Sequence, residues 1–538
     1  MGARQLFRGS THVVRSPAQA AEMVQLSNAQ PEPTRGKFGR WSNKDLDPTL
    51  PEHRTWNSWS FFAFQFSIAL SPTTYNVGAS LYAIGLNWWT ILIATIIVSV
   101  MAAILLYLNS RGATWYHVGF PTIVRSSAGI YGSLICIAIR GIVAVLYTAI
   151  QTLYASLFMA VMLRCVFVHK WTDIPNRLPP TAGITSSNLL AFGILWLLQF
   201  PFAFIHPSKI NIVFRIKSVL APVGLVATMI WALVSSKGAD FQGLGTADAV
   251  TGAALGWSFM KAWNTIVSNV IPPLVNIADL SRYGNRPSQT IPMPVGLVIS
   301  KPLVTLLGMV ITAAGYKQFG EAYWNLWDFY SSVLDKYWSP GARTLVFLDT
   351  YPMLRLSLGL WSIQWPFYKH LRVFVADETP VTVPWKLTYS AASFLTFLGL
   401  TCVSSVLYVD YWLRATSTSL LYSTDTDSPY FFYNGFNLRA FGSWIAAVVL
   451  VVPGVSGSLN PDSVGVAATR IYNMGFLLST VTAGLLYYAN CKIWPVKVFP
   501  SRWSDQPGYW EAMRYTEGFF AGDDHFPGHL IEHSVVTR

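Results

Sequence analysis

Arg140, Tyr147 and Gln151 lie in an apolar stretch at 127–163, where polar side chains are unexpected. Tyr147 and Gln151 are four residues apart, so on a helix they would share one face. An aromatic ring beside an amide could stack on a flat heterocycle and bind the donors and acceptors at its edge. The spacing alone slightly favours another interpretation, an ordinary interhelical hydrogen bond from Gln151 with Tyr147 as packing. For Arg140 we expect a structural role, because a charge in such a segment must face protein or reach the interface.

Two other apolar segments contain polar residues beside proline or glycine. The first holds Ser71-Pro72-Thr73-Thr74-Tyr75-Asn76-Val77-Gly78, and the sixth holds Ser268-Asn269 before Pro272-Pro273. Broken helices in corresponding positions of two five-helix halves are typical of solute sites midway across a membrane. We therefore predict breaks here, with substrate-binding residues Ser71, Thr73, Thr74, Asn76, Ser268 and Asn269. The alternative is a pair of kinks, which membrane helices tolerate.

The sequence offers little for bond-making chemistry. His525, His529 and His533 follow helical spacing, but Pro527-Gly528 intervenes, so a solvated tail fits better than a metal site. The four cysteines are far apart and show neither zinc nor disulfide spacing. A membrane-embedded enzyme would need ionisable residues that converge within the bilayer. We expect no enzyme, no metal and no cofactor.

The elements that position these residues must cross a lipid bilayer. Of 538 residues, 52% are hydrophobic and 12% are charged, whereas about 25% are charged in soluble domains. The run from Trp89 to Tyr107 is long enough to span a hydrocarbon core. We predict an all-α polytopic membrane protein with about eleven readable spans, at 57–83, 89–108, 127–163, 188–205, 218–235, 252–278, 291–316, 343–366, 386–408, 441–457 and 471–490.

Both ends of the chain are predicted to be cytoplasmic. Residues 1–55 are polar and basic and lack the apolar core of a signal peptide. Residues 56–491 would form the transmembrane domain, and 492–538 a basic tail. The formal net charge of +12 fits cytoplasmic loops better than a nucleic-acid partner. An odd number of spans would place the tail outside, so one span is missing or misread after about residue 370.

Several motifs occur in the order found in nucleobase–cation symporters, and the chain resembles the fungal uracil, allantoin and uridine permeases. The matches extend over roughly 43–500 and include Asn43-Lys44-Asp45-Leu46-Asp47-Pro48, Tyr75-Asn76-Val77-Gly78, the stretch from Arg140 to Gln151, Asn276-Ile277-Ala278-Asp279-Leu280-Ser281-Arg282-Tyr283, and Asn434-Gly435-Phe436-Asn437.

The resemblance implies a leucine-transporter-like fold of twelve helices, ten of them forming a 5+5 inverted repeat. It also implies a multi-pass plasma-membrane symporter that imports a nucleobase or ureide, such as uracil or allantoin, with protons as the coupling ion. On matching positions, Tyr147, Gln151 and Ser268-Asn269 would bind substrate, with Ser71 to Asn76 as a looser match. Asp45 is a candidate gating residue, for which a solvated charged segment is the more common explanation. The oligomeric state stays open.

Three departures from the family pattern stand out. Tyr147 replaces the usual Trp, no Asn occurs between Phe347 and Trp385, and that segment is too short for an eighth and a ninth helix. A misjoined exon or shifted reading frame at about 349–380 would explain the last two. The alternatives are a transport-inactive paralogue or sensor, or a thiamine or nucleoside transporter of the same family.

Overall fold

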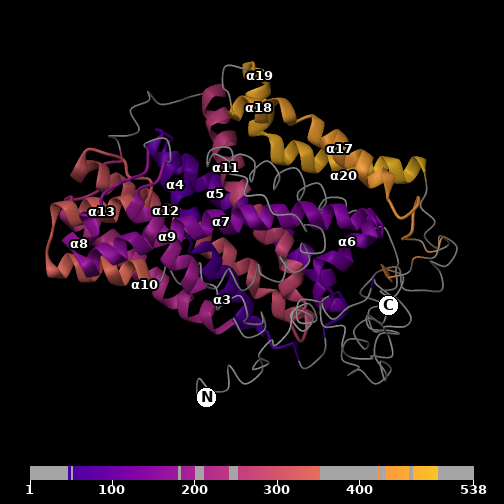
Figure 1. Cartoon of the computed structure of the whole chain (residues 1–538). Helices are drawn as coiled ribbons and strands as arrows, with labels where there is room; N and C mark the ends of the chain where they lie inside the picture. Colours follow the sequence, from indigo (N-terminus) through magenta and orange to yellow (C-terminus); the bar gives the residue numbers. More distant parts are fainter. Residues whose placement is uncertain are drawn as a thin grey trace.

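The structure is a computed structural model that describes residues 53–179, 183–199, 211–241, 252–351 and 464–494, most positions from 421 to 459, and Trp41 with 46–49. In these residues every regular element is a helix (Figure 1), and the β-bridges are isolated ones at Trp56–Gly284 and Tyr433–Phe436. Four helical stretches there are long and apolar enough to cross a membrane: Trp88–Thr114, Gly132–Phe167, Ser218–Ser235 and Ser288–Phe319.

The first predicted span is divided into two helices, α3 (Ser58–Ala69) and α4 (Pro72–Ala83). Pro72 has no N–H to continue α3, and its ring disfavours helical backbone at the residue before it. Ser71 is accordingly extended, with φ −122° and ψ 152°, and its side chain caps α4. The break that the sequence predicts at Ser71 is confirmed.

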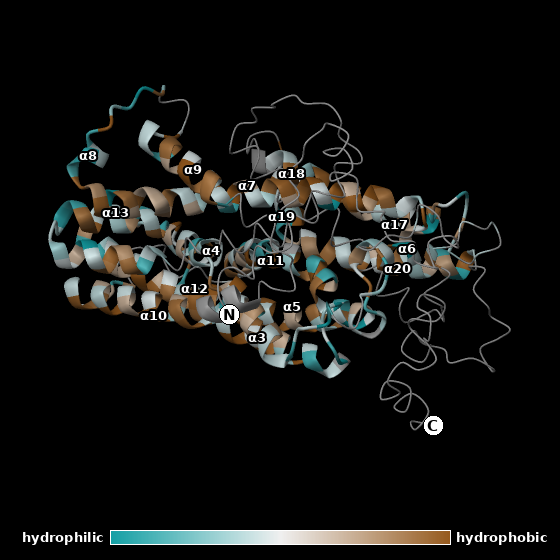
Figure 2. Ribbon diagram, turned by 60° about the horizontal axis from the view of Figure 1, so that its bottom comes forward, coloured by the Kyte–Doolittle hydropathy of each residue, from teal (hydrophilic) through white to brown (hydrophobic). Residues whose placement is uncertain are grey.

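Six helices come next among the described residues. They are α5 (Trp88–Tyr116), α6 (Phe120–Ala128), α7 (Gly132–Phe167), α8 (His169–Thr172), α9 (Ser186–Gln199) and α10 (Asn211–Ser235). Of these, α5 packs against α4, and α10 packs against α3. Figure 2 shows hydrophobic residues along much of α7 and α9. On α10, Val223 is 64% and Val234 is 74% exposed. Apolar side chains exposed in this way suit contact with lipid.

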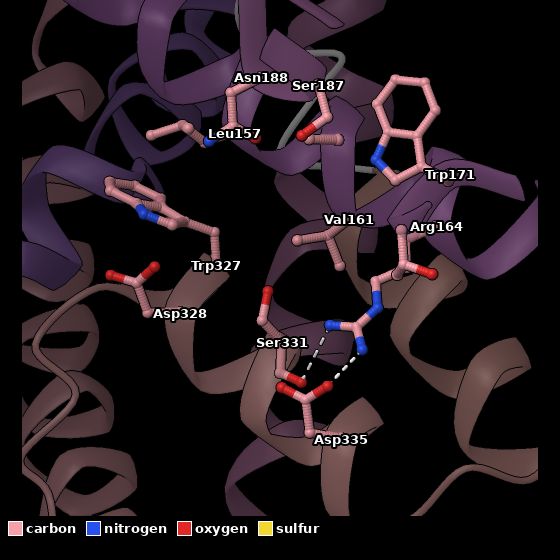
Figure 3. Close-up of a pocket in the computed structure, with 12 residues that line it drawn as sticks. Leu157, Val161, Arg164, Trp171, Ser187, Asn188, Trp327, Asp328, Ser331 and Asp335 are labelled. Carbon is pink, nitrogen blue, oxygen red and sulfur yellow. Dashed lines mark hydrogen bonds and ion pairs between the residues drawn. The ribbon is translucent and has the colours of Figure 1, made fainter. Parts of the chain in front are cut away.

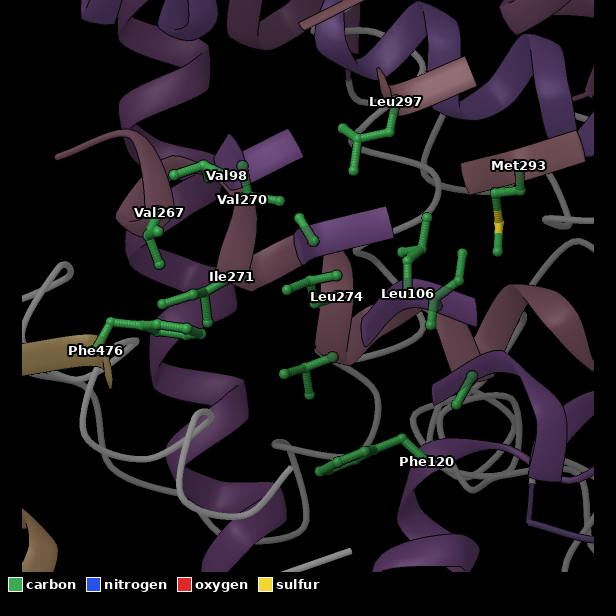
Figure 4. Close-up of a cluster of buried hydrophobic side chains, with 14 of the residues drawn as sticks. Val98, Leu106, Phe120, Val267, Val270, Ile271, Leu274, Met293, Leu297 and Phe476 are labelled. Carbon is green, nitrogen blue, oxygen red and sulfur yellow. The ribbon is translucent and has the colours of Figure 1, made fainter. Parts of the chain in front are cut away.

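The predicted break in the sixth span is wrong, because α11 (Ala253–Ser281) runs through Ser268, Asn269 and both prolines without interruption. An apolar face of α11 explains the continuity, since it is buried against α5 over several turns. Figure 4 shows members of this cluster, with Val267, Val270, Ile271 and Leu274 from α11.

Two helices complete the surroundings of the break. After η7 (Pro287–Thr290), α12 (Pro292–Phe319) packs against α3, α4, α5 and α10, and α13 (Leu326–Lys336) packs against α4 and α7. Residues 340–351 are also helical. Beyond Tyr351, the predicted span 343–366 lies outside the described residues. The whole predicted span 386–408 lies outside them too, as does the part of the segment 349–380 that follows Tyr351.

The last two predicted spans are each divided. The described helices are α17 (Leu438–Val449), α18 (Val452–Leu459), α19 (Val466–Asn473) and α20 (Gly475–Ile493). Helices α17 and α20 lie side by side at one edge of the molecule (Figure 1).

Candidate functional site

The first turn of α4 presents three hydroxyls that belong to the predicted site. The Ser71 Oγ lies 2.8 Å from the Thr73 Oγ1 and 3.2 Å from the Thr74 Oγ1, and it accepts a hydrogen bond from the Thr74 N–H at 3.3 Å. All three side chains are buried. The helix break therefore concentrates polar groups inside an apolar surrounding. A polar solute could form hydrogen bonds there that the hydrocarbon core of a bilayer cannot provide.

Helix α7 brings the predicted pair Tyr147 and Gln151 to this turn. The Tyr147 hydroxyl interacts with the side chains of Gln151 and Thr73. Gln151 is buried and Tyr147 is partly buried. The structure thus places the aromatic ring and the amide beside the break, although they are separated from it by more than seventy residues of chain.

Helices α11 and α12 approach the same turn from another side. The Thr74 Oγ1 donates to the Asn269 Oδ1 at 3.4 Å. The Lys301 Nζ donates to the same Asn269 Oδ1 and lies 3.5 Å from the Thr74 Oγ1. Sequence reasoning missed Lys301, whose signal was a lysine in the middle of the apolar segment 291–316.

Ser268 contributes differently from its neighbour. Its hydroxyl donates to the Thr265 carbonyl at 2.8 Å, within its own helix. Pro272 and Pro273 lack the N–H groups that would normally bond the Ser268 and Asn269 carbonyls. The helix therefore stays continuous while two backbone oxygens in this turn lose their usual helical donors.

Asn76 faces another element. Its Nδ2 donates to the Asn325 Oδ1 at 3.0 Å, and the Asn325 Nδ2 donates to the Asp328 Oδ2 at 3.1 Å. Burial raises the pKa of Asp328, an effect that the hydrogen bond from Asn325 opposes. This chain of polar groups joins α4 to the start of α13.

A pocket of about 390 Å³ lies between α7, α8, the start of α9 and α13 (Figure 3). Trp327 and Asp328 line it, as do Leu157 and Val161 of α7. At one side Arg164 forms an ion pair with Asp335. Leu157 follows Gln151 by six residues, about 9 Å along the helix axis. The pocket therefore lies beyond Gln151 on α7 and reaches the polar chain that ends at Asn76.

At the opposite end of α7, Arg140 forms an ion pair with Asp279 of α11. The Arg140 Nε also donates to the Asn276 Oδ1 at 2.9 Å, and the Phe120 N–H donates to the Asp279 Oδ1 at 3.0 Å. Arg140 thus joins α7 to the motif at 276–283, in agreement with the structural role expected for it.

Thr49, in the segment before α3, is hydrogen-bonded to His117 and to Arg282 of the motif at 276–283. The Thr49 N–H donates to the His117 carbonyl at 2.9 Å, and the Arg282 Nε donates to the Thr49 Oγ1 at 2.5 Å. Burial lowers the pKa of His117, and the nearby Arg54 lowers it further. The candidate gating residue Asp45 lies outside the described residues.

Most of the chain is similar to known permeases and transporters in sequence and in fold. The family model for "Permease for cytosine/purines, uracil, thiamine, allantoin" matches residues 48–357 and 373–479. The allantoin permease of Saccharomyces cerevisiae is 27% identical over 507 residues, covering 89% of this chain and 80% of the relative. The uracil permease of the same yeast is 26% identical over 489 residues, covering 85% and 77%. Among solved structures, Mhp1, a nucleobase-cation-symport-1 family transporter in a closed conformation with bromovinylhydantoin bound, has a TM-score of 0.58 at 18% identity and covers 86% of this chain and 99% of its own.

Proposed function

We propose that this chain, which belongs to the family of permeases for cytosine/purines, uracil, thiamine and allantoin, imports a nucleobase or ureide such as uracil or allantoin across the plasma membrane. The yeast relatives named above are permeases and Mhp1 is a transporter, so the expected family, the leucine-transporter-like fold and the transporter role in place of an enzymatic one are confirmed. The substrate is proposed from the names of the yeast relatives and from the chemistry of the site.

The observation that carries the proposal is the meeting of Tyr147, Gln151 and the first turn of α4 at the helix break. The Tyr147 ring offers a face for stacking, and the Gln151 amide offers one acceptor and two donor hydrogens. Uracil and allantoin carry alternating N–H and C=O groups around a flat ring, which suits this pairing. Ser71, Thr73, Thr74, Asn76, Ser268 and Asn269 complete the proposed substrate site.

The proposed topology assigns the two ends of the site to the two sides of the membrane. The polar residues 1–55 and 492–538 lie in the cytoplasm, and 56–491 form the transporter domain. The pocket beside Trp327 is then the outer vestibule, and the contacts of Thr49 with His117 and Arg282 lie at the cytoplasmic end. We propose the proton as the coupling ion and Asp45 as part of the cytoplasmic gate.

Substitution of Gln151 tests the site. In a transport-deficient host, Gln151→Ala should abolish uptake of radiolabelled uracil and allantoin at unchanged surface abundance, because the substrate edge loses its amide partner. Two variants of Tyr147 test the stacking face. Tyr147→Phe keeps the ring and loses only the hydroxyl, so uptake should fall less than in Tyr147→Ala, which loses both. Competition by nucleobases, nucleosides and ureides would rank the substrates. Wild-type uptake by Gln151→Ala would move the site elsewhere.

One observation favours a second candidate, a transport-inactive relative or sensor. The family match is interrupted at 358–372, within the segment 349–380 that departs from the family pattern. Equilibrium binding of radiolabelled uracil or allantoin to the purified protein without uptake by cells would support this candidate, and uptake would exclude it.

A further inference from the structure

Lys301 is a cationic residue in the interior of an apolar helix. It belongs to the membrane-crossing stretch Ser288–Phe319, and only 3% of its surface is exposed. An ionisable side chain at such a depth is unfavourable unless it has partners, and it commonly marks a site of ion or proton movement. The substrate chemistry proposed above does not require a lysine, so its position calls for a separate explanation.

Among the described residues, Lys301 has no carboxylate partner. The helices that pack against α12, namely α3, α4, α5 and α10, contain no Asp or Glu. The one acidic residue of α11, Asp279, is paired with Arg140. Asp349 in the helix after α13 accepts from the Thr228 Oγ1 at 2.7 Å. No permanent ion pair in this part of the chain holds Lys301 in its charged form.

Three titratable side chains that the structure describes on these helices have partners elsewhere or lie farther along the helix. Tyr82 of α4 donates to the Asp240 carbonyl at 3.0 Å. Arg111 of α5 donates to the Tyr107 hydroxyl. Tyr75 of α4 lies against Gly308, seven residues beyond Lys301 on α12. The described surroundings of the Lys301 amine are therefore neutral.

Neutral oxygen atoms hold the amine in place. The Lys301 Nζ donates to the Asn269 Oδ1 and lies 3.5 Å from the Thr74 Oγ1. The Asn269 and Ser268 carbonyls, which Pro272 and Pro273 deprive of helical donors, lie in the same turn of α11. Such acceptors stabilise an ammonium without fixing it, so that both the charged and the neutral amine can exist there.

We propose that Lys301 is the residue that binds the coupled proton; this inference rests on the proposed function of proton-driven import. The Nζ lone pair takes a proton from water on the outer side, and the N–H bond releases it to water on the inner side. In between, the ammonium links α12 to α11 and α4. Because Thr74 shares the Ser71 cap with Thr73, and Thr73 interacts with Tyr147, the proton and the substrate stabilise one arrangement of α4. Each then increases the affinity for the other.

Purified protein in liposomes tests this assignment with radiolabelled uracil and allantoin and an imposed pH gradient. One proton per neutral solute sustains up to about tenfold accumulation per pH unit. Lys301→Met removes the charge at similar length, so accumulation should fall to equilibrium while exchange of internal for external substrate continues. Lys301→Arg should also fail to accumulate, because a guanidinium does not release its proton. If Lys301 had only a structural role, its replacement would reduce exchange and accumulation together.

Lys317→Met is the matched control, since Lys317 lies near the end of α12 and donates to the Lys237 carbonyl at 2.9 Å. This variant should accumulate substrate like the wild type. Accumulation by Lys301→Met at the wild-type ratio would overturn the assignment, as would a folded Lys301→Met protein that no longer exchanges substrate. If the Met variant does not fold, Lys301→Gln gives the same comparison with a donor kept for Asn269. A wild-type protein that accumulates neither substrate would contradict the proposed function itself.

Discussion

At the residue scale, Tyr147 differs from the Trp usual at its position in ways that the structure makes concrete. Its hydroxyl interacts with Thr73 and Gln151, a contact that an indole ring could not reproduce with the same geometry. The ring presents less area for stacking, while the hydroxyl adds a polar contact to the first turn of α4. If the proposed site binds flat heterocycles, discrimination among them should therefore depend more on hydrogen bonds and less on stacking.

Asp328 yields a prediction about stability and pH. Burial raises its pKa in the folded protein, so the carboxylate is less favourable there than in the unfolded chain. The free energy of unfolding consequently falls as the pH rises through the pKa of Asp328 in the unfolded chain and then through its higher pKa in the folded protein. Asp328→Asn should raise the melting temperature in detergent at neutral pH, and the gain should vanish in acid, where the wild-type carboxyl is protonated in both states. Asp335→Asn, which removes an ion pair with Arg164, should give no such gain. A gain independent of pH would contradict this account.

At the element scale, glycine lets α4 and α12 approach closely. A Cβ on Gly78 would lie 2.7 Å from the Thr305 Cγ2, and one on Gly308 would lie 2.8 Å from the Tyr75 carbonyl oxygen. Small residues at helix contacts are typical of membrane proteins, where close packing replaces much of the hydrophobic driving force. This approach brings Lys301 of α12 within reach of Thr74.

Gly308→Ala should therefore lower the melting temperature and proton-driven accumulation together. Alanine favours a helix interior by up to about 1 kcal/mol over glycine, but relieving a clash with backbone in a packed interface costs typically about 1–3 kcal/mol. Gly484→Ala is the control, because no heavy atom lies within 4 Å of a Cβ added in α20. Thermal unfolding in detergent measures both variants. Equal melting temperatures for the two would show that α4 and α12 separate easily.

At the scale of the whole molecule, the segment before α3 fastens parts of the chain that are far apart in sequence. The Thr122 Oγ1 and the Tyr422 hydroxyl both donate to the Leu46 carbonyl, at 2.8 and 2.7 Å. Thr49 contacts Arg282. These bonds join α6, the region before α17 and the end of α11. In the proposed topology they hold the cytoplasmic end closed.

Arg282→Ala should loosen this end. With the four native cysteines replaced, a cysteine at Thr114, which is 1% exposed, reports the opening. In detergent, a maleimide should label Thr114→Cys faster when combined with Arg282→Ala, because the Thr49 contact is lost. Lys261→Ala, an exposed change on the same helix, should leave the rate unchanged. An unaltered rate in the Arg282 variant would mean that these bonds do not limit opening.

The sequence by itself determined the membrane class and the family. Hydropathy sums over the whole chain, so no single misassigned residue changes the conclusion. The break at Ser71 was also readable, because Pro72 and the capping hydroxyls act on adjacent residues. Tyr147 and Gln151 were predicted to share a helix face from their spacing, and the family resemblance, not the spacing, made them candidate substrate-binding residues.

Tertiary structure decided the rest, because contacts distant in sequence outweigh local preference. Proline at 272 and 273 favours a break, but burial of Val267, Val270 and Leu274 against α5 keeps α11 continuous. The partners of Lys301, Thr74 and Asn269, are 227 and 32 residues away. No spacing rule connects such positions. Only the packing of α12 on α4 shows that a buried lysine lies beside the proposed substrate site.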